Sequence, residues 1–268
     1  MKKEIVLIAA VLFSTAALVQ AQEGELHGAV DLTYQSKYVW RGFNVFGDKS
    51  AIQASVDLDL YGTNFGCNLT GHRANSSGYE NFERWDYTLY YHNKLFQDET
   101  YATDYMVAWR YYNYPDNSSG DIDLQEAHAL LSWPEICPAG FIPRYCLVKL
   151  WPSESGSWIG SRSPLGGTAS GWAHILMVDY PMTIPGILPE TPEQVLNWHS
   201  ELVFNDGVHP VGGDVDHDWS NFVLGASTDF DLGNNMTLTP GLFYQVSMEE
   251  TVNDDDQLWA TVGVKYKF

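Results

Sequence analysis

The chain has 268 residues, of which 14 are basic and 34 acidic, giving a formal net charge of −20 at pH 7. A chain this acidic does not favour phosphate, so nucleic acid is excluded as an expected partner. Beyond its first residues it has no run of about 18 apolar residues, which excludes a transmembrane helix but not a barrel of strands of about 9 to 11 residues.

The N-terminal stretch predicts a secretory signal peptide over residues 1–21. A basic start, an apolar core and a small-residue cleavage pattern follow one another in MKKEIVLIAAVLFSTAALVQA. An N-terminal membrane anchor is the alternative, but the apolar run is short for about 20 spanning residues. Removal would leave 268 − 21 = 247 residues, with 14 − 2 = 12 basic and 34 − 1 = 33 acidic side chains and a charge of −21. We expect a single domain over residues 22–268, because no linker-like change of composition interrupts it.

Alternation of apolar and polar residues dominates the rest of the chain. In VDLTYQSKYVWRGF (30–43) one face is mainly apolar and the other carries Asp, Thr, Gln, Lys and Arg, and AIQASVDLDLYG (51–62) alternates in the same way. Further strands are expected near 64–73, 82–95, 101–113, 122–133, 141–151, 170–181, 195–205, 218–231, 235–247 and 257–268. This pattern predicts an all-β fold, an antiparallel transmembrane β-barrel of about twelve strands, roughly 10–14.

Aromatic residues near the expected strand ends favour a membrane barrel over a soluble antiparallel sandwich, which also alternates. Tryptophan and tyrosine gather at membrane interfaces, where their rings are partly apolar and partly hydrated. The pairs expected to form such girdles are Tyr38 and Trp40, Trp85 and Tyr87, Trp109 and Tyr111, and Trp219 and Phe222.

The last strand, QLWATVGVKYKF, alternates up to the final residue. One face carries Leu258, Ala260, Val262, Val264, Tyr266 and Phe268. The other face carries Lys265 and Lys267, and a slip of one residue would turn both toward lipid at a cost of about 2–4 kcal/mol for a lysine at the midplane. The register is therefore specified.

This ending resembles the recognition strand of Gram-negative outer-membrane barrels, which ends on Phe with an aromatic residue two positions earlier. By that resemblance, Tyr266 and Phe268 form an assembly signal read by the barrel-assembly machinery. Together with the signal peptide, it implies a location in the cell outer membrane.

Over about the first third of the mature chain, LTYQSKYVWRGF (32–43) and then AIQASVDLDLYGTNFGCNLTGHRANSSG (51–78) resemble the opening of the TorF-type porin family. The matching positions are Ser36, Tyr38, Arg41, Gly42, Gln53, Asp57, Ala74 and Asn75. Lys37 stands where that family has an acid, and His72 where an aromatic residue is expected. The resemblance implies fold and location more firmly than transport.

The polar faces of the expected strands carry charged residues in mid-strand. The candidates for lining a lumen are Asp31, Asp57, Asp59, Asp86, Arg110 and Glu201. A pore through about twelve strands would be narrow, and carboxylates would favour cations. We expect passive passage of small hydrophilic solutes or cations, with outer-membrane lipid as surroundings, no cofactor and no catalysis. A barrel that is plugged or filled by side chains, with its acidic loops merely solvated, is the alternative.

Two weaker features concern metal ions and disulfides. Asp214, Asp216 and Asp218 alternate behind two glycines and are oxygen ligands that Ca²⁺ accepts, but the EF-hand pattern is missing, so a solvated loop is favoured. Cys137 and Cys146 would pair across a hairpin in an oxidising compartment, while other pairings stay open.

Two other functions compete with the porin. A lipid-modifying enzyme of the outer membrane would use a Ser–His site, for which His72 lies near Ser76 and Ser77 in sequence. His199 and Ser200 point to opposite faces of one strand and do not pair directly. A secreted β-sandwich that binds glycan through its many aromatic residues is the second competitor.

Overall fold

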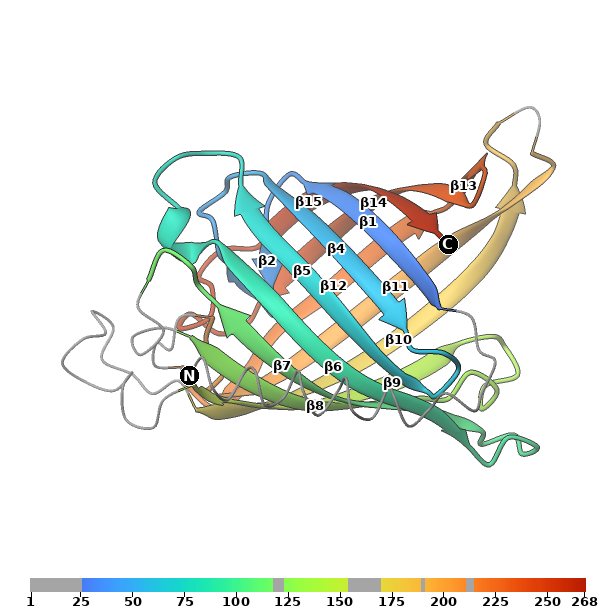
Figure 1. The fold of residues 1–268 in the computed structure, drawn as a ribbon, viewed down its shortest axis with the longest axis horizontal. Helices are drawn as coiled ribbons and strands as arrows, with labels where there is room; N and C mark the ends of the chain where they lie inside the picture. Colours follow the sequence, from blue (N-terminus) through green and yellow to red (C-terminus); the bar gives the residue numbers. More distant parts are fainter. Residues whose placement is uncertain (1–25, 118–122, 154–169, 189–190, 211–214) are drawn as a thin grey trace.

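A computed structural model describes residues 26–117, 123–153, 170–188, 191–210 and 215–268. The expected signal peptide, 1–21, lies outside these residues and stays a prediction. In the described parts, twelve long strands form one antiparallel barrel (Figure 1). No helix within those parts is long and apolar enough to cross a membrane.

The long strands are β1 (His27–Gln35), β4 (Ala51–Asp59), β5 (Phe65–Ala74), β6 (Arg84–Leu95), β7 (Thr103–Asn113), β8 (Leu124–Ser132), β9 (Ile142–Pro152), β10 (Gly171–Pro185), β11 (Glu193–Asp206), β12 (Asp218–Thr228), β14 (Met236–Ser247) and β15 (Gln257–Lys267). Shorter elements are β2 (Val39–Trp40), β3 (Phe43–Asn44), β13 (Phe230–Gly233) and the 3-10 helix η1 (Glu80–Phe82).

The barrel closes between its first and last strands. β1 pairs with both β4 and β15, and β12 pairs with β14, so that no long strand is left with a free edge. At the very end, Phe268 and Gly28 exchange two backbone hydrogen bonds of 3.0 Å. The predicted antiparallel barrel of about twelve strands is therefore confirmed, and the final residue is part of its seam.

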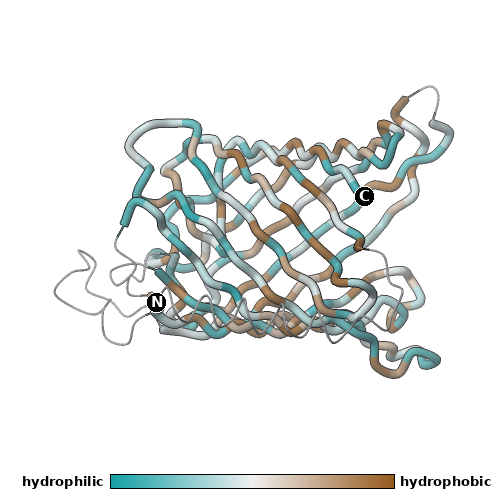
Figure 2. The backbone as a smooth tube through the Cα atoms, viewed as in Figure 1, coloured by the Kyte–Doolittle hydropathy of each residue, from teal (hydrophilic) through white to brown (hydrophobic). Residues whose placement is uncertain are grey.

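Hydrophobic and hydrophilic residues follow one another along the strands, as the colours in Figure 2 show, and their exposure separates an outward surface from the interior. On β1, Val30 and Leu32 are 44% and 54% exposed, and on β15 Leu258 is 57% exposed although it is apolar. Gln257 and Trp259 on the opposite face of β15 are buried. Because apolar side chains face outward and polar ones inward, the solvent around the barrel wall is lipid.

The two rims differ in the length of their connections. The long-loop rim carries the connections after β1, β5, β7, β9, β11 and β14, and the short-turn rim carries the others together with the C-terminus. Exposed Trp85, Tyr87 and Trp219 lie near the long-loop rim, and the stacked pair Tyr266 and Phe268 lies at the short-turn rim. These positions are those of two interfacial girdles.

The first strand ends earlier than its alternation predicts. β1 stops at Gln35 rather than near residue 43, and the chain then turns into the barrel. Tyr38 and Trp40 were expected in an interfacial girdle. Tyr38 is instead 3% exposed, and Trp40 lies in the interior beside Tyr112. The girdle prediction is wrong for this pair, because both rings find partners inside the barrel.

Candidate functional site

Residues 36–50, here called the inserted segment, leave β1 and fold into the barrel before β4 begins. Within it, β2 and β3 pair through Trp40 and Phe43, so that Arg41 and Gly42 form a two-residue turn. Both turn residues have positive φ, 48° and 95°, as a type I′ hairpin turn requires. The turn places Arg41 at the tip of a small hairpin.

A buried ion pair attaches this tip to the barrel wall. Arg41 donates from Nη1 and Nη2 to Oε2 and Oε1 of Glu126 on β8, at 2.7 and 3.0 Å. Glu126 also accepts a hydrogen bond of 2.6 Å from the hydroxyl of Tyr112 on β7. The Glu126 side chain is fully buried, and that of Arg41 is 12% exposed. Two parallel charge-assisted bonds fix the position and the orientation of the tip.

The same tip also contacts the far side of the barrel. The carbonyl oxygen of Gly42 accepts hydrogen bonds from Nε2 of Gln245 on β14 at 2.8 Å and from Nδ2 of Asn253 at 3.1 Å. β8 and β14 are five strand pairings apart in a ring of twelve, which puts them almost opposite each other. The inserted segment therefore crosses the interior.

Two aromatic side chains that precede the tip, Tyr38 and Trp40, pack against polar and charged wall residues. The hydroxyl of Tyr38 accepts a hydrogen bond of 2.9 Å from Nη2 of Arg84 on β6, and its ring stacks on His72 at 5.0 Å between centroids. The Arg84 guanidinium lies 5.0 Å from the ring centroid of Trp40, and Trp40 meets Tyr112 edge-on at 6.1 Å. These cation–π and aromatic contacts add to the attachment of the segment.

Wall residues around the inserted segment are almost fully covered. An apolar patch on β9, β10 and β11 includes Val148, Leu150 and Val203, and Trp40 packs against it. At the height of the inserted segment along the barrel, the inward-facing residues that are at most 9% exposed include His72, Arg84, Tyr112, Glu126, Leu150, Ala173, Val203, Asn221, Gln245 and Gln257. The half of the interior near the long-loop rim is therefore closed to solvent.

The connection after β11 completes this closure. The ring of His209 meets Phe43 of the inserted segment edge-on, with centroids 4.7 Å apart. Phe43 also forms a buried cluster with Val215 and Val252. Burial lowers the pKa of His209 to about 4, so that its imidazole is neutral at pH 7.

The half of the interior near the short-turn rim keeps contact with water. Asp31 on β1 is half-buried, accepts a hydrogen bond of 2.7 Å from Oγ1 of Thr33, and faces Lys265 in the register of β15. On β4, Asp57 accepts hydrogen bonds from Asn68 at 3.2 Å and from the hydroxyl of Tyr90 at 2.9 Å. Because Asn68 and Tyr90 are neutral donors, their hydrogen bonds do not cancel the negative charge of Asp57.

The other expected lumen residues on this side of the ring have charged or polar partners. Asp59 lies one inward position beyond Asp57 on β4, and its Oδ1 is 3.5 Å from Nε2 of His92. Asp86 is buried in the closed half, where it accepts hydrogen bonds from Arg84. Arg110 on β7 donates from Nε to Thr88 at 2.9 Å.

Glu201 faces inward from β11, on the far side of the ring from β4. One inward position nearer the short-turn rim, Oδ2 of Asp179 accepts a hydrogen bond of 2.9 Å from Arg144, and its Oδ1 lies 2.6 Å from Nδ1 of His199. This trio was not singled out in the sequence, because its members lie on three strands and carry no shared motif.

The six predicted lumen residues therefore share the inward face without forming one cluster. Asp31, Asp57 and Asp59 lie on the adjacent strands β1 and β4, whereas Asp86 lies in the closed half and Glu201 across the barrel. Their role in solute passage stays a prediction.

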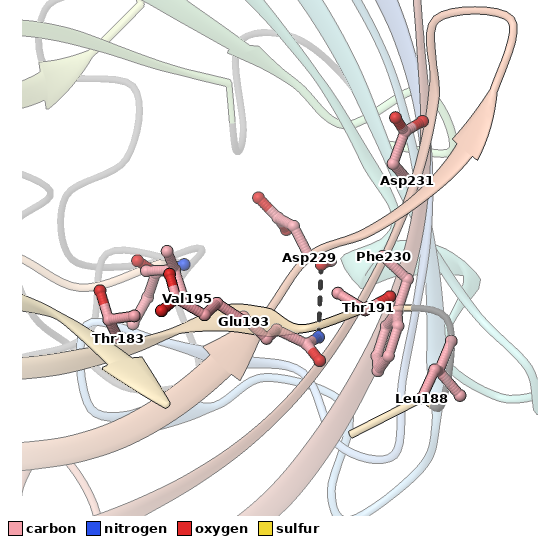
Figure 3. A pocket seen from close by; sticks show the side chains of 10 residues that line it. Thr183, Leu188, Thr191, Glu193, Val195, Asp229, Phe230 and Asp231 are labelled. Carbon is pink, nitrogen blue, oxygen red and sulfur yellow. Dashed lines mark hydrogen bonds between the residues drawn. The ribbon is translucent and has the colours of Figure 1, made fainter. Parts of the chain in front are cut away.

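A pocket of about 460 Å³ lies at the short-turn rim near the ends of β10, β11 and β12 (Figure 3). Carboxylates of Glu193, Asp229 and Asp231 line it, and Val195 contributes apolar surface. Nε2 of Gln194 donates to the backbone oxygen of Asp229 at 3.4 Å. The three carboxylates give this part of the rim negative charge.

The histidines considered for a Ser–His site have other partners. Both ring nitrogens of His72 are engaged, one by a glutamine of β4 at 2.7 Å and the other by Asp86 at 3.0 Å. His199 contacts Asp179, and Ser200 donates from the opposite face to a backbone carbonyl. This geometry gives the hydrolase no support.

The expected disulfide between Cys137 and Cys146 is not formed, and both thiols are free. Cys137 lies in the connection before β9, whereas Cys146 is the fifth residue of that strand. At about 3.3 Å per residue, Cys146 lies roughly 13 Å along β9 from its first residue, and Cys137 lies before that residue. Cys67 on β5 is free as well.

The weak calcium expectation gains no support. Asp214 lies outside the described residues, and Asp216 and Asp218 are exposed to solvent. Across the described part of the chain, no three His, Cys, Asp or Glu side chains gather as metal ligands.

Comparisons with known proteins agree with this architecture. No family model matches the chain, and no curated protein matches it. Among solved structures, a NanC porin superposes with a TM-score of 0.54 at 9% identity, covering 89% of this chain and 100% of the porin. A KdgM porin in complex with disordered oligogalacturonate gives 0.50 at 8% identity, covering 90% and 99%. The prediction of a porin-like, outer-membrane type of barrel is confirmed at the level of the fold.

Proposed function

We propose that this protein is an outer-membrane porin that lets small hydrophilic solutes diffuse passively, with a preference for cations. The observation that carries the proposal is the polar, water-accessible interior near the short-turn rim. It continues into the half near the long-loop rim, which the inserted segment fills. A loop can leave a barrel without breaking the pairing of the wall strands. Side chains that project inward from the wall strands cannot leave the interior in this way.

The distribution of charge supports the preference for cations. Asp57 is held by neutral donors, and Glu193, Asp229 and Asp231 add negative charge at the rim. Carboxylates along a narrow path raise the local concentration of cations and repel anions. The arginines Arg84 and Arg144 are each paired with an aspartate, which weakens their opposing effect.

No catalysis is assigned in this proposal. The outward apolar band and the two aromatic girdles fit a protein surrounded by outer-membrane lipid. Tyr266 and Phe268 are proposed as the signal for the barrel-assembly machinery, and deleting Phe268 should reduce the folded fraction in the membrane, as measured by the heat-dependent gel shift. Unchanged assembly would remove this role.

The channel is tested by planar-bilayer recording of the purified protein in a KCl gradient. We expect discrete conductance steps and a reversal potential on the cation-selective side. Asp57→Asn should move that potential toward zero, because it removes a carboxylate without changing the shape of the side chain. Asp116→Asn, in an exposed position after β7, serves as the matched control and should leave it unchanged. A wild-type protein that gives no steps at any voltage would overturn the proposed function.

A further inference from the structure

We infer that the inserted segment, residues 36–50, is a gate: it closes the long-loop half of the barrel and opens it by withdrawing its Arg41–Gly42 tip from between β8 and β14. This inference rests on the proposed function, since a gate needs a channel to close. It deepens that function by naming the element that regulates passage.

The segment is built to move as one unit. Its base is closed by the pairing of Gln35 on β1 with Ala51 on β4, two adjacent strands of the wall. Because the segment begins and ends at this pair, its hairpin can swing without altering the register of any wall strand. Ser36 and Ser50 can stay bonded to Ala260 and Asn75 at the base. The contacts that have to break are those of the tip, those of its aromatic flanks and the hydrogen bond of 3.0 Å from Nζ of Lys37 to Gln257.

The wall behind the segment is suited to becoming wet. Besides the apolar patch on β9 to β11, the inward residues that the segment covers include Arg84, Glu126, Gln245 and Asn221. A segment that served only to fill a core would be expected to cover apolar residues, since burying polar groups is costly unless all are satisfied. The covered wall has the character of a pore lining.

The closed state is not fully satisfied at the tip. In the described structure, Nδ2 of Asn221 and Oε1 of Gln245 are buried without a hydrogen-bond partner. Both side chains contact or adjoin Gly42: Nε2 of Gln245 donates to its carbonyl, and a Cβ at Gly42 would lie 2.7 Å from Oδ1 of Asn221. Withdrawal of the tip would let water reach both unsatisfied atoms, which favours opening and offsets the loss of the Arg41–Glu126 pair. Opposing contributions of this kind permit two populated states.

A disulfide that ties the tip to the wall tests the gate. A Cβ at Gly42 would lie 3.2 Å from Cγ of Asn221, the place that a sulfur would take in Asn221→Cys. This spacing suits a disulfide between Gly42→Cys and Asn221→Cys, made in a background with Cys67→Ala, Cys137→Ala and Cys146→Ala. We expect the oxidised protein to lose its conductance steps and to regain them when a reductant is added.

The matched control is the single Gly42→Cys variant in the same background, which carries the strain of a side chain at φ 95° without the cross-link. Its conductance should not respond to oxidant. If the first pair does not fold, Gly42→Cys with Val252→Cys is the second pair, because a Cβ at Gly42 would lie 2.7 Å from Cγ1 of Val252.

The two possible failures are distinguishable. If the cross-linked protein, verified by mass, conducts as well as its reduced form, the gate is overturned and the channel stands. If neither form conducts and the single variant is also silent, the channel itself is wrong and the gate falls with it.

Discussion

Replacing Glu126 by alanine should lower the free energy of unfolding by about 3–5 kcal/mol, the usual cost of removing one partner of a buried ion pair. Arg41 would remain in a nearly dry site without its two charge-assisted bonds, and the Tyr112 hydroxyl would lose its acceptor. Since withdrawal of the inserted segment lets Arg41 reach water, part of this loss should appear as a larger open fraction in bilayer recordings. Denaturant unfolding in detergent measures the first effect.

A second charge pair of the same segment supplies the control. Lys37 and Asp48 are 2.7 Å apart, but Asp48 is 63% exposed. Exposed pairs contribute about 0–1 kcal/mol, so Asp48→Ala should change the unfolding free energy by no more than that. Equal, small losses for Glu126→Ala and Asp48→Ala would mean that the Arg41–Glu126 pair does not hold the segment.

Acidification should loosen the inserted segment through His209. Its pKa is about 4 in the buried site and about 6.5 when the ring is free in water, so the released state binds more protons between these values. The contribution of neutral His209 is therefore fully present above about pH 6.5 and is lost as the pH falls toward 4. At about 1.4 kcal/mol per pH unit, the total loss is on the order of 3 kcal/mol. The open fraction should rise between pH 7 and pH 5.

His209→Gln is the matched variant for this effect, because it keeps a polar side chain of similar size that does not titrate. The variant should show a flatter dependence of the open fraction on pH over the same range. If wild type and variant respond to acid identically, His209 does not set the response.

The alternation of residues was enough to predict the barrel, because lipid outside and a polar interior both act on every second side chain. It could not predict where β1 ends. Tyr38 and Trp40 continue the apolar face of the expected strand, so periodicity does not distinguish a longer strand from a hairpin that turns inward. The distinction depends on the positive φ of Arg41 and on its partner Glu126, which lies 85 residues away in the sequence.

The inward positions of the lumen candidates were likewise readable from alternation, but their electrostatic surroundings were not. Asp86 is partnered by Arg84 two residues away on the same face of β6, whereas Asp179 gains Arg144 and His199 from neighbouring strands. Only the register of strand pairing brings the second set together. The disulfide predicted from the spacing of Cys137 and Cys146 is not formed, because the spacing alone did not reveal that Cys146 lies within β9.

The most direct test of a channel closed by the inserted segment is the conductance of a variant in which residues 37–49 are replaced by a short glycine–serine link. The link joins Ser36 to Ser50 next to Gln35 and Ala51, the residue pair of β1 and β4 that closes the base of the segment. The wall should therefore remain folded, and the heat-dependent gel shift checks that it does. If the inserted segment closes the barrel, the variant should give a larger and more persistent conductance than the wild type under the same voltage and salt. A folded variant whose conductance equals that of the wild type would contradict it.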